Sequence, residues 1–355
     1  MSQARTVMVP ALADVHTHLR EGNLVGSLLQ LAEKGGADVL GAMPNTAEGL
    51  KSASQVLDYF DHAASLKSAL KVGVNVFPFL MITEETTVEE IEICVHRGIY
   101  HAKVYPRFRT TNSKNGVVQY GRLIPIIKRC GELGMTVHFH PEHPSPIFSN
   151  RDAEFAFLPI VRLLLEETQA KIFWEHGTDA RCIPHWVDMA NASSRFFVTL
   201  TAHHLVTTED RTFGDVRSVC KPPIKLESDR QGLVELIGKN YPWVMAGGDS
   251  AFHPKTAKHV DAGTCSCGAF TSPFLLPLYA HALDDLLQTE EGIRTFVRFT
   301  SGNAGWSFGL RPATKNIKLI REEWKIPLSY EVGDQIGLPF WAGQKINWQI
   351  KRDEI

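Results

Sequence analysis

Histidine is the residue type whose placement first suggests chemistry in this sequence. The 355 residues include 15 histidines, and several stand in tight groups, namely His16/His18, His138/His140/His143 and His203/His204. Neutral imidazole is the commonest metal ligand among protein side chains. Most histidines nevertheless lie on the surface or in a satisfied core, so their position relative to the predicted strands decides what they can do.

The first pair, His16 and His18, alternates along a predicted strand. Residues two apart share one face of a strand, so both imidazoles are expected to point to the same side, together with Asp14. Two such nitrogens can bind one Zn²⁺, and Asp14 can orient a ligand through a hydrogen bond. His-x-His alone is a weak motif, whereas the full stretch 12–20, LADVHTHLR, is far more specific.

Three further candidate ligands follow later strands. His140 and His176 are each followed by polar or turn residues and could hold a second metal, although either one alone could be a buried histidine bonded to backbone. Asp249 comes directly after a hydrophobic strand. It is either a carboxylate ligand or the N-cap of a following helix, and Pro254, close behind in what reads as a loop, weakens the N-cap interpretation.

Lys103 lies near the end of another predicted strand, 99–104. An ammonium facing two zinc ions would be repelled, and desolvation together with nearby cations favours the neutral amine. A neutral amine can take up CO₂ as a carbamate, which is a negative ligand able to bridge two metals. The alternative is a lysine at the rim of the fold that forms a salt bridge or reaches into solvent.

The elements that must position these residues are eight short apolar runs, each ending in polar or small residues. They lie at 9–16, 39–43, 72–79, 99–104, 135–140, 171–175, 196–201 and 243–247. Helical patterns stand between most of them, for example at 24–31, 53–70 and 154–167. Apolar strands that alternate with helices indicate a parallel sheet buried on both faces. Eight such units in about 250 residues predict a TIM (β/α)8 barrel, whereas an open doubly wound sheet would want a glycine-rich turn after its first strand, which the sequence lacks.

In such a barrel the chemistry takes place at the carboxyl ends of the strands. The polar residues at five of those ends are His16, His18, Lys103, His140, His176 and Asp249. We expect one domain over 1–355, with a barrel core at about 9–310 and a C-terminal extension at 311–355 packed on the barrel. The stretch 340–348 within the extension is either a closing strand or a packed tail.

Composition excludes several other classes of function. The chain has 37 basic and 39 acidic side chains and a net charge of -2, so it carries no basic footprint for nucleic acid. No run approaches the roughly 20 apolar residues that span a bilayer, and no apolar leader opens the sequence.

The six cysteines are expected to be reduced, in a cytoplasmic protein. Cys265 and Cys267 are interpreted as small loop residues rather than a redox or metal pair, and a homodimer is expected only from the frequency of such assemblies.

Several motifs together resemble those of the dihydroorotases of the short, single-function type, within the amidohydrolase superfamily. They are Asp14-x-His16-x-His18-Leu19-Arg20-Glu21-Gly22, Met43-Pro44-Asn45, Lys103-Val104-Tyr105-Pro106 with Thr110-Thr111-Asn112-Ser113, and Gly248-Asp249-Ser250-Ala251-x-His253. The stretches 199–205 (TLTAHHL) and 220–222 (CKP) are most similar to the fungal branch. The similarity covers about residues 12 to 348, almost the whole chain.

The resemblance implies a role for each position. His16, His18 and Asp249 would hold one zinc ion and His140 and His176 a second, bridged by carboxylated Lys103 and a hydroxide. Asp249 would also move the proton. The substrate carboxylate would be bound by Arg20, Asn45 and His253, and Thr110 and Thr111 would belong to a loop that closes over the substrate. The implied reaction interconverts N-carbamoyl-L-aspartate and (S)-dihydroorotate in pyrimidine synthesis, so the partner would be a small anionic cyclic amide.

The sequence departs from the family pattern at three places. Pro141 stands where the family has glycine, Phe252 where it has proline, and residues 46–50 replace a proline-rich loop. These changes leave the metal set intact and bear on the substrate, so a related enzyme for a hydantoin or a dihydropyrimidine is the first alternative. A metal-free barrel with a structural role is the second.

Overall fold

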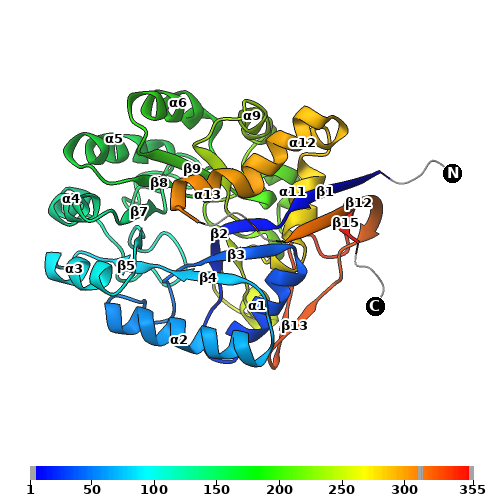
Figure 1. The fold of residues 1–355 in the computed structure, drawn as a ribbon, viewed down its shortest axis with the longest axis horizontal. Coiled ribbons are helices and arrows are strands. Elements are labelled where there is room, and N and C mark those ends of the chain that lie inside the picture. Colours follow the sequence, from blue (N-terminus) through cyan, green and yellow to red (C-terminus); the bar gives the residue numbers. More distant parts are fainter. Residues whose placement is uncertain (1–4, 311–312, 314, 352–355) are drawn as a thin grey trace.

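A parallel barrel is the central element of the computed structural model, which describes residues 5–310, 313 and 315–351. Its strands are β2 (Leu12–His18), β3 (Ala37–Ala42), β4 (Asn75–Pro78) with β5 (Leu80–Ile82), β6 (His101–Val104), β7 (Thr136–Phe139), β8 (Ile172–Trp174), β9 (Phe196–Leu200) and β10 (Val244–Ala246) with β11 (Ser250–Ala251). They form two ladders, β11-β2-β3-β4 and β10-β9-β8-β7-β6-β5, in which every pair is parallel. Because β4 leads into β5 and β10 leads into β11, the ladders join at both ends and close the barrel (Figure 1). The predicted fold class is confirmed.

Helices surround these strands (Figure 1). The longer ones are α1 (Leu24–Lys34), α2 (Ala53–Ala69), α3 (Val88–His96), α4 (Ile124–Glu132), α5 (Leu158–Glu167), α6 (Ile183–Ala192), α9 (Glu227–Gly238), α11 (Leu275–Ala282), α12 (Glu290–Val297) and α13 (Asn303–Phe308). The short ones are α7 (Ala202–Val206), α8 (Glu209–Thr212) and α10 (Lys255–Lys258). Single 3₁₀ turns lie at Tyr120–Leu123, Phe155–Phe157, Ala180–Cys182, Val216–Ser218, Ser272–Phe274 and Leu286–Gln288, and a π turn lies at Arg298–Gly302.

Local sequence signals explain where these helices begin and which face they bury. Ser52 and Gln55 form a capping box at the start of α2. The helices α4, α5 and α6 each carry a proline within their first two residues, where its missing N–H is harmless. The buried residues of α5 are Leu158, Val161, Leu164 and Leu165, which form one stripe at helical spacing.

The first predicted strand, 9–16, is wrong in its bounds because the chain changes sheets there. Residues Thr6–Pro10 form β1, which pairs antiparallel with β12 (Asn316–Lys325). After Pro10, which has no N–H to donate, the Ala11 N–H donates to the Lys315 carbonyl and the Leu12 N–H donates to the Gly36 carbonyl of the barrel. The third predicted strand, 72–79, is also displaced, since β4 begins only at Asn75 and β5 continues it to Ile82.

The C-terminal residues form a small sheet of their own. β12 lies between β1 and β15 (Lys345–Ile350) in a three-stranded antiparallel sheet, and β15 packs against α11. β15 is therefore not a closing strand of the barrel, which was one of the two possibilities for 340–348. A hairpin of β13 (Tyr330–Val332) and β14 (Gln335–Gly337) lies between β12 and β15 in the sequence.

Over the part of the chain that the structure describes, no helix is both long enough and apolar enough to cross a bilayer.

Candidate metal centre

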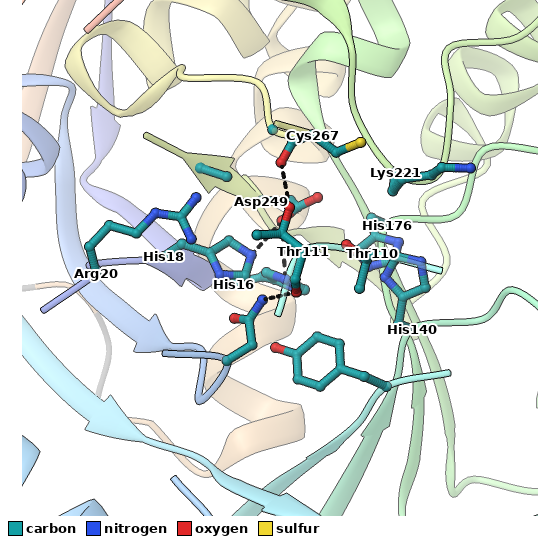
Figure 2. A pocket seen from close by; sticks show the side chains of 14 residues that line it. His16, His18, Arg20, Thr110, Thr111, His140, His176, Lys221, Asp249 and Cys267 are labelled. Atoms are coloured by element: carbon teal, nitrogen blue, oxygen red, sulfur yellow. Dashed lines mark hydrogen bonds and ion pairs between the residues drawn. The ribbon is translucent and has the colours of Figure 1, made fainter. Parts of the chain in front are cut away.

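One pocket at the carboxyl ends of the strands brings most of the predicted site residues together (Figure 2). Its lining consists of His16, His18, Arg20, Asn45, Tyr105, Thr110, Thr111, His140, His176, Lys221, Asp249, Ala251, Cys267 and Gly268. Two predicted residues are not in the lining. Lys103 is fully buried, and the His253 Nε2 atom lies 3.1 Å from Arg20 Nη2 and 2.8 Å from the Cys267 carbonyl.

His16, His18 and Asp249 form one group of donor atoms. The Nε2 atoms of His16 and His18 lie 3.3 Å and 2.9 Å from the same oxygen, Asp249 Oδ1. The pairing of β11 with β2 sets this arrangement, and the Asp249 N–H donates to the His16 carbonyl at 2.7 Å. Burial favours the neutral acid, but the two imidazoles hold the pKa of Asp249 well below its usual value. The three ligand atoms lie within 4.8 Å of one another, a spacing that a single metal ion can span.

Asp14 holds the backbone around this group and does not reach an imidazole. Its Oδ1 atom accepts hydrogen bonds from Gly248 N at 2.7 Å and from His16 N at 3.2 Å. The side chain therefore fixes the residue before Asp249 relative to the strand that carries both histidines.

His140 and His176 form a second group on the other side of Asp249 (Figure 2). Their ring centroids lie 4.6 Å apart, and the ring of His176 lies 5.2 Å from that of His16. The His140 Nε2 atom bonds to the buried Glu142 carboxylate at 2.6 Å, which leaves Nδ1 for another partner. The His176 Nδ1 atom is buried and has no hydrogen-bond partner among residues 5–310, 313 and 315–351. Burial lowers the pKa of both imidazoles, so both are neutral and can offer a lone pair.

Lys103 lies next to the pocket, with its Nζ atom 5.4 Å from the ring centroid of Tyr105, a lining residue. Its side chain is 0% exposed, and within the described ranges its Nζ atom has no hydrogen-bond partner. Burial lowers the pKa of this amine to about 8, although Glu175 and Asp249 oppose the shift. The alternative of a solvent-reaching or ion-paired lysine is therefore wrong. A buried amine and a buried imidazole nitrogen that lack partners are the chemistry expected of a metal site, so the donor set fits zinc ions.

Glu175 is the residue of this region that the sequence analysis missed. It is fully buried, and its carboxylate accepts hydrogen bonds from His16 Nδ1 at 2.9 Å, from His138 Nδ1 and from Thr199 Oγ1. His16 and Lys103 hold its pKa well below the usual value against the opposing effect of burial. The available signal was a charged residue at the end of an apolar strand, directly before the candidate ligand His176.

Arg20 and Asn45 come from the loops after β2 and β3. The Arg20 Nε atom donates to the Phe252 carbonyl at 2.7 Å, and burial lowers the pKa of the guanidinium to about 10, which leaves it charged at neutral pH. The Asn45 amide donates to the Thr111 carbonyl at 3.2 Å. The Thr111 hydroxyl donates to the Cys267 carbonyl at 3.1 Å, so the loop that carries Thr110 and Thr111 lies against the pocket wall.

The three departures from the family pattern lie outside the pocket lining. Pro141 sits in a tight turn, with the Glu142 N–H donating to the His140 carbonyl at 3.0 Å. The Phe252 ring packs at 5.5 Å from that of Phe270, in an apolar cluster. Residues 46–50 form a hydrogen-bonded turn, and the Ala47 N–H donates to Glu21 Oε2 at 2.9 Å. The departures therefore do not alter the side chains that face the pocket.

A second buried group, His203, His204 and Cys220, has the residue types of a metal site. Within the described residues neither ring nitrogen of His203 has a hydrogen-bond partner, but the other two members are poor ligands. The His204 Nε2 atom lies 3.0 Å from the Pro222 carbonyl, which only accepts, so this nitrogen must carry a hydrogen. The other nitrogen, Nδ1, bonds to the Thr201 hydroxyl. Burial raises the pKa of the Cys220 thiol to about 12, which disfavours the thiolate that binds metals.

Comparisons with known proteins place the whole chain among relatives of similar sequence and fold. No family model matches the chain. The chain is 30% identical over 352 residues to a protein named probable dihydroorotase from Schizosaccharomyces pombe, covering 97% of this chain and 98% of that protein. The solved dihydroorotase from Saccharomyces cerevisiae, in complex with 5-fluoroorotic acid, superimposes with a TM-score of 0.88 at 25% identity, covering 98% of both chains. An L-hydantoinase from Arthrobacter aurescens shares the fold, with a TM-score of 0.80 at 14% identity over 97% of this chain and 82% of that one.

Proposed function

The chain belongs to the dihydroorotase family, and we propose that its pocket interconverts N-carbamoyl-L-aspartate and (S)-dihydroorotate, the family's reaction in pyrimidine biosynthesis. It is a zinc-dependent hydrolase of a cyclic amide rather than a metal-free structural barrel. The observation that carries the proposal is one pocket that combines two groups of buried histidines, an ionised aspartate and a charged arginine.

We assign two zinc ions to this pocket. His16, His18 and Asp249 would hold one ion, and His140 and His176 the other, with carboxylated Lys103 shared between them. The unpartnered atoms Lys103 Nζ and His176 Nδ1 support this assignment, because a native protein rarely leaves such groups buried without a partner. Zinc ions bound there would polarise the ring carbonyl and make hydroxide available near neutral pH.

Asp249 moves the proton in this scheme. Its Oδ1 atom faces His16 and His18, which leaves Oδ2 to act as the base. During hydrolysis the Oδ2 atom takes the proton of the attacking nucleophile and then gives it to the ring nitrogen as the C–N bond breaks. The strongly lowered pKa of Asp249 keeps the carboxylate ionised and ready for the first transfer.

Arg20 selects the substrate by charge. Its Nε atom is fixed on the Phe252 carbonyl, so the remaining guanidinium hydrogens are oriented to bind a planar carboxylate. Asn45 and His253 would complete the carboxylate site, and the Thr110 and Thr111 hydroxyls would bind the substrate and exclude water from above. Hydantoins and dihydropyrimidines without a carboxylate would leave this arginine unpaired in a partly closed pocket.

The cytoplasmic location and the homodimer expected from the sequence are further proposals.

The test compares substrates and one substitution. The purified enzyme should hydrolyse dihydroorotate with a kcat/KM far above that for hydantoin or dihydrouracil. The Arg20→Met enzyme should lose about 10- to 100-fold in kcat/KM for dihydroorotate, since a charge-assisted pair contributes about 1.5–3 kcal/mol. The exposed Arg122 serves as control, and Arg122→Met should change neither value. Equal activity on hydantoin or dihydrouracil would instead indicate an enzyme of the hydantoinase type.

A further inference from the structure

Glu175 takes no part in the scheme above, although its carboxylate lies at the centre of the polar network beneath the pocket. We propose that Glu175 is the positioning residue that makes His16 offer its Nε2 atom to the metal, by holding the hydrogen of the ring on Nδ1. The inference rests on the proposed zinc site and concerns how this chain's own residues prepare it.

Hydrogen-bond direction is the first step of the argument. An ionised carboxylate can only accept hydrogen bonds. The His16 Nδ1 atom lies 2.9 Å from Glu175 Oε2, so this nitrogen must be the one that carries the hydrogen. An imidazole that binds a metal is neutral and has one N–H and one lone pair, so with the hydrogen on Nδ1 the lone pair is left on Nε2. That atom is the one that faces Asp249 Oδ1 at 3.3 Å within the proposed ligand group.

The carboxylate itself is held in place from its other side. Glu175 Oε1 accepts from Nδ1 of His138, whose Nε2 atom bonds to the Thr136 hydroxyl at 2.9 Å. The His138 ring also stacks on Phe173, with centroids 4.1 Å apart. Because one oxygen accepts a hydrogen bond from His138 and the other accepts one from His16, the orientation of the carboxylate is fixed.

The same carboxylate also reaches the second half of the site. The Thr199 hydroxyl donates to Glu175 Oε2 and accepts from the His176 N–H at 2.8 Å. His176 has a φ of 41°, an unusual value for a residue other than glycine, so its backbone needs such support. Glu175 therefore links a ligand on β2 with the backbone of a ligand that follows β8. Hydrogen-bond partners of metal-binding histidines typically affect metal affinity by about 10- to 100-fold.

The experiment separates the acceptor from the charge. Glu175→Gln keeps a carbonyl oxygen, which can face His16 and Thr199 while the amide NH₂ faces His138, whose tautomer can change. Glu175→Leu removes every acceptor. Zinc affinity, measured on the full-length protein by competition with a chelator, should fall about 10- to 100-fold in Glu175→Leu and less than about tenfold in Glu175→Gln.

Glu154 is the matched control. Its carboxylate is equally buried and accepts from Thr178 N at 2.8 Å and from Lys225 Nζ at 2.6 Å, but it contacts none of the proposed ligands. Glu154→Leu should lower the melting temperature and leave zinc affinity unchanged.

The inference is overturned if Glu175→Leu binds zinc as tightly as the wild type, or if Glu175→Gln loses as much affinity as Glu175→Leu. Should Glu175→Leu not fold, Glu175→Gln decides alone, because a loss above about tenfold would show that charge rather than the acceptor matters. A wild-type protein that binds no zinc would instead contradict the proposed function, which keeps the two failures distinct.

Discussion

Lys103 has a buried amine beside the pocket, without a hydrogen-bond partner in the described parts of the chain. Two other buried lysines do have partners: Lys225 is paired with Glu154 at 2.6 Å, and Lys258 donates to the Val219 carbonyl at 3.1 Å. Leaving a buried donor unpaired costs about 1–3 kcal/mol, so the native protein is expected to supply a partner. Carboxylation would supply it, because the carbamate is an anion that two zinc ions can share.

We expect Lys103→Ala to lose most of its activity together with part of its zinc. The substitution removes the shared anion, so zinc content should fall below the about two equivalents expected of the wild type. Short carboxylic acids such as acetate can enter the vacated space and should restore part of the activity. The control is Lys171→Ala, which changes an exposed lysine directly before the barrel strand β8 and should leave activity and zinc content unchanged. Wild-type turnover by Lys103→Ala would show that the bridging assignment is wrong.

At the scale of single residues, the sequence predicts what lies at a strand end and misses what depends on contacts across the barrel. His16, His140 and Asp249 each follow an apolar run, so the periodicity alone places them at one end of the barrel. Glu175 bonds to His16 and His138, which stand 159 and 37 positions away. No local pattern connects such distant positions. Arg20 and Asn45 were expected only from the family resemblance.

The loop after β6 contributes Thr110 and Thr111 to the pocket lining, and we propose that it covers the bound substrate. Arg109 donates to the carbonyls of His143 at 2.8 Å and Phe148 at 3.0 Å, and also to that of Ser145. These bonds tie the loop to the segment after β7. Phe108, directly before Arg109, has a left-handed φ of 60° and an exposed side chain. Such a conformation costs roughly 1–2 kcal/mol, and the bonds of the Arg109 guanidinium offset it in the observed position.

Arg109→Ala should therefore open this loop without disturbing the metal. Losing several bonds to a charged donor, each worth about 1.5–3 kcal/mol, should lower kcat by tenfold or more. Zinc content should stay at the wild-type level, and protease should cut the 107–116 segment faster. Thr111→Ala should likewise lower kcat more than zinc binding, because its hydroxyl contacts the pocket wall rather than a ligand.

Arg107 provides the comparison within the same loop. It pairs with Glu84 at 3.3 Å on the surface, and surface pairs contribute about 0–1 kcal/mol. Its Nε atom donates to the Gly116 carbonyl at 3.1 Å, a bond within the loop that does not tie it to the segment after β7. Arg107→Ala should keep kcat within about twofold. If Arg109→Ala and Arg107→Ala behave alike, the loop is an ordinary connection and not a cover.

At the scale of elements, the barrel could be predicted from the sequence, and the small sheet beside it could not. Apolar runs such as β7 and β9 are buried at every residue, so they stand out in the sequence. β1 and β12 are partly exposed, and Thr6 pairs with Ile320 from the opposite end of the chain. Neither the composition nor the periodicity of one strand identifies so distant a partner.

The two ends of the described chain meet in this sheet at one side of the molecule (Figure 1). Trp348 on β15 is fully buried, and its Nε1 atom donates to Asp284 Oδ1 at 2.7 Å. Its carbonyl accepts from Trp324 Nε1, also at 2.7 Å. We propose that these contacts make the barrel core and the C-terminal extension one cooperative unit, as a single domain over 1–355 would require.

Trp348→Ala tests this proposal at the scale of the whole molecule. Removing a fully buried tryptophan should lower the free energy of unfolding by about 3–5 kcal/mol. Because the proposed zinc ligands lie on or directly after other strands, folded Trp348→Ala should keep its kcat. Trp306, which is 61% exposed, is the matched control, and Trp306→Ala should cost less than about 1 kcal/mol. In one cooperative unit, zinc release and loss of secondary structure shift together to lower temperature. Two transitions, with zinc release at its wild-type temperature, would mean that the extension unfolds separately.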